Sequence, residues 1–121
     1  MTPYDFKKMT DKIFTECDLL LNSKNKEYAR NNDKLHNFKV AARTRGLTPE
    51  SALGGMMLKH TISIYDYIND SDDGLFHPLS QWDEKIKDHI NYLLLLRALI
   101  VERENIEKHL CECGDKNKSG D

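Results

Sequence analysis

The sequence predicts an all-α protein with four main helices in a small bundle. Only three prolines and six glycines interrupt its 121 residues, and so few helix-breaking residues favour long helices. Apolar residues recur every three or four positions over most of the chain, as in helices with one buried face, and no strand-like alternation is sustained. The length suits one domain. We expect a single helical domain over residues 1–110 and a flexible polar tail over 111–121.

The first helix is predicted to begin with Thr2 as N-cap and Pro3 at the first helical position, and to end near Leu21. Helical spacing of its apolar residues predicts one buried face. These residues are Phe6, Met9, Ile13, Cys17, Leu20 and Leu21. Residues 22–32 are rich in asparagine and lysine, which indicates a helix end followed by an irregular loop.

Start and stop signals mark the second and third helices. Asp33 is the expected N-cap of the second helix, which should stop at Gly46. Its inward residues are predicted to be Leu35, Phe38 and Ala42. The Thr-Pro-Glu sequence at residues 48–50 is a strong start signal for the third helix, which should run to about Asn69.

The fourth helix is predicted to be long and apolar on two sides. Residues 80–83 provide its capping sequence, and the helix could extend to about Leu110. One apolar row contains Trp82, Ile86, Leu93 and Ile100, nearly opposite a second row with Leu95 and Leu99. A helix that is apolar on both sides is sandwiched. We therefore expect it at the centre of the bundle or shared with a second subunit, and we expect a homodimer or higher oligomer.

Composition narrows the classes of partner. The formal net charge of −2 gives no overall basic field for duplex DNA, although a local basic cluster over residues 24–45 leaves nucleic-acid binding as a weaker alternative. Three cysteines are too few for a disulfide framework, which fits a reducing cytoplasm. No apolar run reaches the length of a membrane span, and the first residues lack the core of a signal peptide. Small ligands or protein partners are expected, without a membrane.

The strongest candidate site is a polar row on the fourth helix. Glu84, Asp88 and Asn91 lie at positions i, i+4 and i+7, and the same line continues through Leu95 and Leu99. Because apolar rows face protein, this line predicts that the polar groups face inward, where carboxylates need a metal, another cation or a hydrogen-bonding ligand. The alternative is that two acids one turn apart belong to a solvated helix face.

His60 lies within an apolar row of the third helix. That row is completed by Leu53, Met57, Ile64 and Ile68. The imidazole could be a core histidine with one hydrogen bond, or a metal ligand or proton carrier facing Glu84 and Asp88. Lys59 could form a solvated pair with Asp66 or contact a phosphate.

A third cluster lies in the segment 26–38, where donors and acceptors surround two aromatic residues. Binding groups often gather in such connecting segments, and this chemistry suits a base and a phosphate. The candidate binding residues are Arg30, Asp33, His36 and Asn37. The alternative is a connecting loop in which Asp33 only caps the following helix.

Several of these motifs, taken in order, resemble the phage nucleotide-modification-associated domain family, first of its series. The resemblance covers roughly residues 20–101 and rests on residues 27–30, 33–38, 41–42, 49–50, 55–60, 63–66 and 84–93. That family is distantly similar to the MazG-like all-helical nucleotide pyrophosphatases, which hold magnesium against a triphosphate with acidic pairs on two helices. Asp88 matches the last of those acids, whereas Lys85 stands where the paired glutamate would be.

The resemblance implies a MazG-like bundle in a phage protein that acts on or binds nucleotides, in nucleotide metabolism or DNA base modification, within the cytoplasm of the host bacterium. Glu84, Asp88 and His60 would be catalytic, with Mg²⁺ or Mn²⁺ held by the two carboxylates. The nucleotide or other phosphorylated ligand would be bound by Arg30, Asp33, His36, Asn37, Lys59 and Asn91. The activity would be hydrolysis of a nucleoside triphosphate to release pyrophosphate, or binding alone.

The alternative function is a non-enzymatic phage protein that binds and inhibits a host or defence protein. In that case Glu84, Asp88 and His60 would form a buried polar network that fixes the register of the helices.

Overall fold

The computed structural model describes residues 1–23 and 33–111, with side chains as far as Asn105, and within these ranges the chain forms four helices. They are α1 (Pro3–Ser23), α3 (His36–Arg45), α4 (Pro49–Asp72) and α5 (Leu79–Cys111). The predicted all-α class is confirmed. In the same part of the chain, no helix combines the length and the apolar character needed to cross a membrane.

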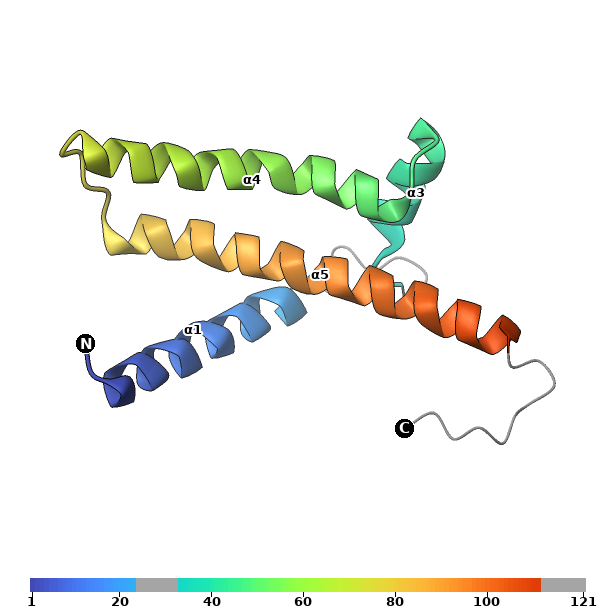
Figure 1. Cartoon of the computed structure of the whole chain (residues 1–121), viewed down its shortest axis with the longest axis horizontal. Helices are drawn as coiled ribbons and strands as arrows, with labels where there is room; N and C mark the ends of the chain where they lie inside the picture. The colour runs from blue at the N-terminus through green and yellow to red at the C-terminus, as the bar shows by residue number, and fades with distance from the viewer. Residues whose placement is uncertain (24–32, 112–121) are drawn as a thin grey trace.

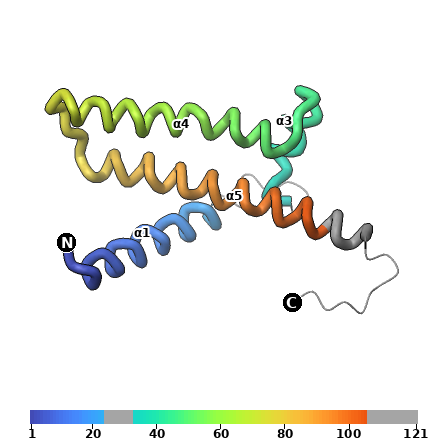
Figure 2. Tube along the Cα trace, viewed as in Figure 1, coloured from blue at the N-terminus to red at the C-terminus, as the bar shows by residue number. Residues whose placement is uncertain are grey.

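The helices are arranged around α5, the longest of them. α4 and α5 form an antiparallel hairpin, α1 contacts α5 from the opposite side, and the short α3 contacts the beginning of α4 (Figure 1). The trace in Figure 2 shows the same order, with α5 between α4 and α1. The central position predicted for the doubly apolar helix is therefore observed within a single chain.

Three helix boundaries follow the predicted local signals. The Thr2 Oγ1 accepts a hydrogen bond from the Asp5 N–H at 3.1 Å, and the Thr48 Oγ1 accepts one from the Ser51 N–H at the same distance. Each threonine thus satisfies one of the free N–H groups in the first turn of its helix. Gly46 ends α3 with a φ of 65°, a left-handed conformation that glycine adopts without strain.

The predicted N-cap of α3 at Asp33 is wrong. The helix begins at His36, and the preceding position is occupied by Leu35, which has no side-chain acceptor. Asp33 instead forms a turn ahead of the helix, in which its Oδ1 accepts from the Leu35 N–H at 3.0 Å. Leu35 is buried in the core, so packing of this side chain, rather than capping, determines where α3 starts.

The predicted capping role of Ser80 in α5 is also wrong. α5 already begins at Leu79, so Ser80 lies inside the helix. The carbonyl of Pro78 accepts hydrogen bonds from the N–H groups of Gln81 at 3.0 Å and Trp82 at 3.2 Å. A backbone carbonyl therefore starts the hydrogen-bond ladder of this helix.

The core lies at the end of the molecule where α3, the beginning of α4 and the second half of α5 meet. Its buried members are Leu35, Phe38, Leu53 and Leu99, with Met57, Tyr92, Leu95, Leu96 and Ala98 packed against them. Leu53 is completely buried. The inward positions predicted for Leu53 and Leu99 are therefore confirmed.

α1 is attached to α5 mainly through its C-terminal half. Cys17 is buried, and burial raises the pKa of its thiol, which fits a core residue rather than a nucleophile. Glu16 forms an ion pair with Lys87 of α5 at 2.7 Å. Phe6 and Met9 are exposed, so the prediction that the apolar face of this helix is buried along its whole length is wrong.

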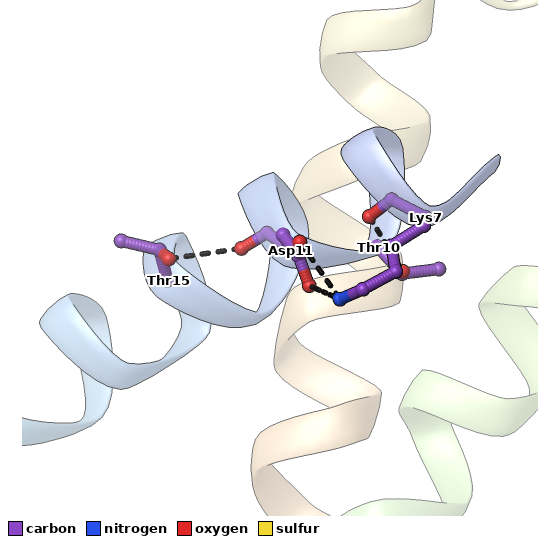
Figure 3. A network of polar contacts seen from close by, with 4 residues as sticks. All are labelled: Lys7, Thr10, Asp11 and Thr15. Atoms are coloured by element: carbon purple, nitrogen blue, oxygen red, sulfur yellow. Dashed lines mark hydrogen bonds and ion pairs between the residues drawn. The ribbon is translucent and has the colours of Figure 1, made fainter. Parts of the chain in front are cut away.

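α1 also carries local polar contacts within the helix. Lys7 forms an ion pair with Asp11 one turn later at 3.0 Å (Figure 3). The hydroxyls of Thr10 and Thr15 donate to backbone carbonyls three and four residues earlier. All these contacts lie within one helix and in solvent, where the ion pair adds only a few tenths of a kcal/mol, so they do not determine the position of α1.

Candidate functional site

Two adjacent pockets lie along α5 and share Asp88. The inner pocket has a volume of about 290 Å³ and is lined by Leu21, Lys34, Asn37, Phe38, Met56, Asp88, Asn91, Tyr92 and Leu95. The outer pocket has a volume of about 510 Å³ and is lined by Lys59, His60, Ser63, Tyr67, Gln81, Glu84, Lys85 and Asp88. We call the two pockets together the binding groove.

The predicted polar row on α5 runs through the binding groove, and its burial increases along the helix. Glu84 is exposed, Asp88 is half-buried, and Asn91 is only 8% exposed. The inward orientation is therefore confirmed for Asn91 and wrong for Glu84. The reason is that α1 and α3 contribute to the wall of the inner pocket only, whereas the outer pocket is lined by α4 and α5 alone.

The outer pocket contains a lysine held in a defined position. The Nζ of Lys85 donates to the Oγ of Ser63 and lies 4.5 Å from the centroid of the Tyr67 ring. The Tyr67 hydroxyl in turn donates to the Oε1 of Gln81 at 3.0 Å. Lys85, at the position where the family resemblance would place an acid, thus adds a positive charge beside Asp88. An ammonium over an aromatic ring is stabilised by the negative face of that ring.

His60 and Lys59 reach the outer pocket from α4. His60 is half-buried, and its ring lies 4.9 Å from the ring of Tyr92, tilted by 40°. Lys59 is exposed. The predicted meeting of His60 with Glu84 and Asp88 in one pocket is therefore observed.

The inner pocket contains a polar atom that nothing in the described part of the chain satisfies. The Oδ1 of Asn91 is buried and has no hydrogen-bond partner there. The walls around it are largely apolar, with Phe38, Met56 and Leu95 among them. A buried amide oxygen without a partner costs about 1–3 kcal/mol, so such groups are rare in native cores and point to a ligand or an ordered water.

Lys34 closes one side of the inner pocket. Its Nζ donates to the carbonyl oxygen of Leu21 at 2.7 Å, which ties the end of α1 to the segment before α3. Burial lowers the pKa of Lys34. Asn37 is exposed and lies in the wall of the same pocket.

The remaining predicted binding residues do not line the groove in the described part of the chain. Arg30 lies outside the described residues. Asp33 forms an ion pair with Lys39 at 2.7 Å, and Lys39 also contacts Glu102 of α5 at 2.5 Å. His36 is the half-buried first residue of α3. The structure therefore places Asp33 in a link between α3 and α5.

The ion pair between Asp33 and Lys39 should stabilise the fold at neutral pH but not in acid. The hydrogen bond from Lys39 holds the pKa of Asp33 below its ordinary value. Since the unfolded value is about 3.9, this carboxylate stabilises the fold above that pH, and the contribution disappears as the pH falls through the lower, folded value. We expect the stability difference between the native chain and Asp33→Asn, measured by urea unfolding, to shrink as the pH falls below about 5.

A matched control for this prediction is Asp11→Asn, which removes an exposed ion pair within one helix. It should change the free energy of unfolding by less than about 0.5 kcal/mol at neutral pH. A difference in the free energy of unfolding between the native chain and Asp33→Asn that stays constant from neutral pH to pH 3 would contradict a stabilising role for the Asp33 carboxylate.

Sequence reasoning missed several residues of the groove. Ser63, Tyr67, Gln81 and Lys85 in the outer pocket were not identified as site residues, nor were Lys34 and Tyr92 in the inner pocket. One signal was available, because Ser63 and Tyr67 follow His60 at i+3 and i+7 and therefore share its helix face. The contact of Ser63 with Lys85 depends on the relative register of α4 and α5, which helical spacing does not define.

The groove offers oxygen ligands for a hard cation. Glu84 and Asp88 lie one helical turn apart and line the same pocket. Within the part of the chain that the structure describes, no group of three or more His, Cys, Asp or Glu side chains is placed to hold a metal ion. Two carboxylates are nevertheless the usual protein contribution to a magnesium site that is completed by phosphate and water.

Comparison with known proteins gave no match: no family model, no curated protein and no solved structure matches this chain. Functional assignment therefore depends on the chemistry of the groove.

Proposed function

We propose that the chain binds a nucleotide along α5, with the base in the inner pocket and the phosphates in the outer pocket. The observation that carries this proposal is the unpartnered Oδ1 of Asn91 in an apolar-walled pocket that adjoins a pocket containing two lysines. Asp88 lines both pockets, so one elongated ligand can occupy them together. A nucleotide matches these two pockets. Its base has flat ring faces and hydrogen-bonding edges, and its phosphates at the other end are anionic.

The inner pocket suits a base. Its volume of about 290 Å³ lies near the lower limit of small-molecule pockets, about 300 Å³. Phe38 and Tyr92 supply aromatic surface, on which any base can stack. The Asn91 amide oxygen can accept a hydrogen bond from an exocyclic amino group or a ring N–H, which would satisfy the atom that lacks a partner.

The outer pocket suits phosphates and a divalent cation. Lys59 and Lys85 can contact phosphate oxygens as positive charges. The residues present fit Mg²⁺ or Mn²⁺, because both ions prefer oxygen ligands and Glu84 and Asp88 supply two carboxylates beside the proposed phosphate position. When bound, such a cation neutralises phosphate charge and polarises the phosphorus–oxygen bonds.

In the hydrolytic form of this proposal, water adds across the bond between the α and β phosphates and pyrophosphate leaves. His60, which lines the same pocket as both carboxylates, would take the proton that the water gives up. The phage origin, the role in nucleotide metabolism or base modification and the host-cytoplasm location belong to the same proposal and depend on the family resemblance alone.

Ligand-induced stabilisation tests the proposal. Nucleoside triphosphates with Mg²⁺ or Mn²⁺ should raise the melting temperature, because a ligand at 100 times its Kd stabilises the folded state by about 2.7 kcal/mol. Asp88→Asn keeps the side-chain shape but removes the charge, so it should abolish the part of the shift that requires the ion. Asp66→Asn, an exposed acid of α4 that is not among the groove-lining residues, should leave the shift unchanged.

Absence of a shift with every nucleotide, with and without either ion, would contradict the binding proposal. An unchanged ion-dependent shift in Asp88→Asn would show that this carboxylate does not hold the cation.

A specific observation favours the alternative of a non-enzymatic partner-binding protein. Leu58, Ile62 and Tyr65 form an exposed apolar row on α4. Such rows mark protein interaction surfaces when they are contiguous. This alternative predicts no nucleotide shift and assigns Glu84, Asp88 and His60 to a polar network between α4 and α5.

A further inference from the structure

The side of α5 away from the binding groove carries a second apolar row, which the rest of the described chain leaves largely uncovered. Leu79, Ile86, Leu93 and Ile100 follow one another at intervals of seven residues, and we call this row the outer stripe. Leu79 is 72%, Leu93 46% and Ile86 36% exposed, whereas Ile100 is half-buried. Leu94 and Val101, also exposed, widen the stripe. α4 and α1 contact α5 but do not bury this row.

Within the described part of the chain, exposed hydrophobic residues also outnumber buried ones. Seven hydrophobic residues are buried within the described ranges, whereas twenty large hydrophobic residues are exposed. Single exposed apolar residues are ordinary on a monomer, but a continuous row along a long helix is not. Further burial of apolar surface is therefore available to this fold, and the outer stripe is where a straight partner helix could contact it.

The spacing of the outer stripe identifies the kind of partner. A seven-residue apolar repeat is the pattern by which one helix packs along another over several turns. The segments of this chain outside the described residues offer little apolar surface for this purpose. Their only hydrophobic residues are Tyr28 and Ala29 in 24–32, and Cys113 in 112–121. Neither segment therefore supplies the apolar row that a partner helix needs.

Charges beside the outer stripe favour a second copy of the same chain. Asp83 and Arg97 lie seven residues before and after Ile90, on the line adjacent to the stripe. In an antiparallel pair of α5 helices centred near Ile90, each Asp83 would face Arg97 of the partner subunit. A parallel pair would place like charges together. Arg97 is exposed and forms no ion pair within the described part of the chain, whereas Asp83 interacts electrostatically with Lys87.

We propose that two copies of the chain associate through antiparallel packing of their α5 helices along the outer stripe. The arrangement is self-complementary, as a two-fold interface requires. Because the outer stripe and the binding groove lie on opposite sides of α5, both grooves stay open in the dimer. The dimer proposal is independent of the nucleotide proposal.

Light scattering after gel filtration tests the interface. The native chain should have about twice the monomer mass of 14.1 kDa. Leu93→Glu should reduce the mass to that of a monomer, because the substitution places a charge in the middle of the stripe. Leu58→Glu is the matched control, since Leu58 is also an exposed leucine but lies on α4, outside the stripe, and this variant should remain a dimer. Circular dichroism of both variants should show retained helix.

A native chain that is monomeric at 100 µM, or a Leu93→Glu variant that remains a dimer, would overturn the proposal. The Leu93→Glu monomer also separates the two proposals, because its nucleotide-dependent melting shift should persist.

Charge reversal tests the antiparallel orientation. Asp83→Arg and Arg97→Asp should each raise the dimer Kd by about tenfold, since each replaces an attraction across the interface with a repulsion. The double variant restores opposite charges and should return the Kd to within about threefold of the native value. A double variant that binds no more tightly than either single variant would overturn the antiparallel arrangement.

Discussion

Leu53→Ala should lower the free energy of unfolding by about 2–5 kcal/mol, because it removes most of a completely buried side chain and leaves a cavity. Leu53 packs with Leu35, Phe38 and Leu99, which join three helices. Few other buried residues can compensate, since the described part of the chain buries only seven hydrophobic residues. Urea unfolding at one fixed protein concentration measures the effect, because the contribution of chain association to the two free energies is then compared under the same conditions.

The matched control is Leu58→Ala, five residues later on the same helix, where the side chain is 57% exposed. The same chemical deletion should cost less than about 1 kcal/mol at this position, since little apolar surface leaves a packed environment. Equal losses for the two variants would show that the end of α4 near α3 is not the core of the protein.

Asn91→Leu should raise the free energy of unfolding by about 1–3 kcal/mol while abolishing nucleotide-dependent stabilisation. The gain is expected because the substitution removes a buried amide oxygen without a partner and replaces it with an apolar group of similar size. The loss is expected because the same oxygen is the proposed acceptor for the base. Opposite changes in stability and binding are typical of residues kept for function.

Asn37→Leu is the control for this prediction, since Asn37 carries the same amide in the wall of the same pocket but is exposed. It should leave the free energy of unfolding within about 0.5 kcal/mol of the native value. A marked loss of stability in Asn91→Leu would show that the amide is satisfied in the folded protein, and retention of the nucleotide shift would place the base elsewhere.

The helices were predictable because their signals are local. The threonine caps at Thr2 and Thr48 and the left-handed glycine at Gly46 act within one turn of the backbone, so their effect does not depend on the rest of the fold. The same reasoning predicts Asp33 and Ser80 as N-caps, and both predictions are wrong. There the start of the helix is set by the burial of Leu35 and by the backbone after Pro78.

The candidate site was predictable only in part. Helical periodicity placed Asp88 and Asn91 on one line, and both line the inner pocket. The same periodicity could not show that Glu84 is exposed, because that depends on how far α1 and α3 extend along α5. Lys85 shows most clearly what periodicity within one helix cannot predict. Its contacts with Ser63 and Tyr67 join residues 22 and 18 positions apart on two helices.

The sequence alone determined the all-α class, the extents of the long helices and the two apolar sides of α5, because these depend on backbone signals and side-chain spacing within single helices. Tertiary structure alone decided which of those sides is covered. α1 and α3 close over the row that contains Asn91 and Leu99, which creates a pocket with an unpartnered amide. On the opposite side Leu79, Ile86 and Leu93 stay exposed, since packing against α4 and α1 uses other faces of the same helix.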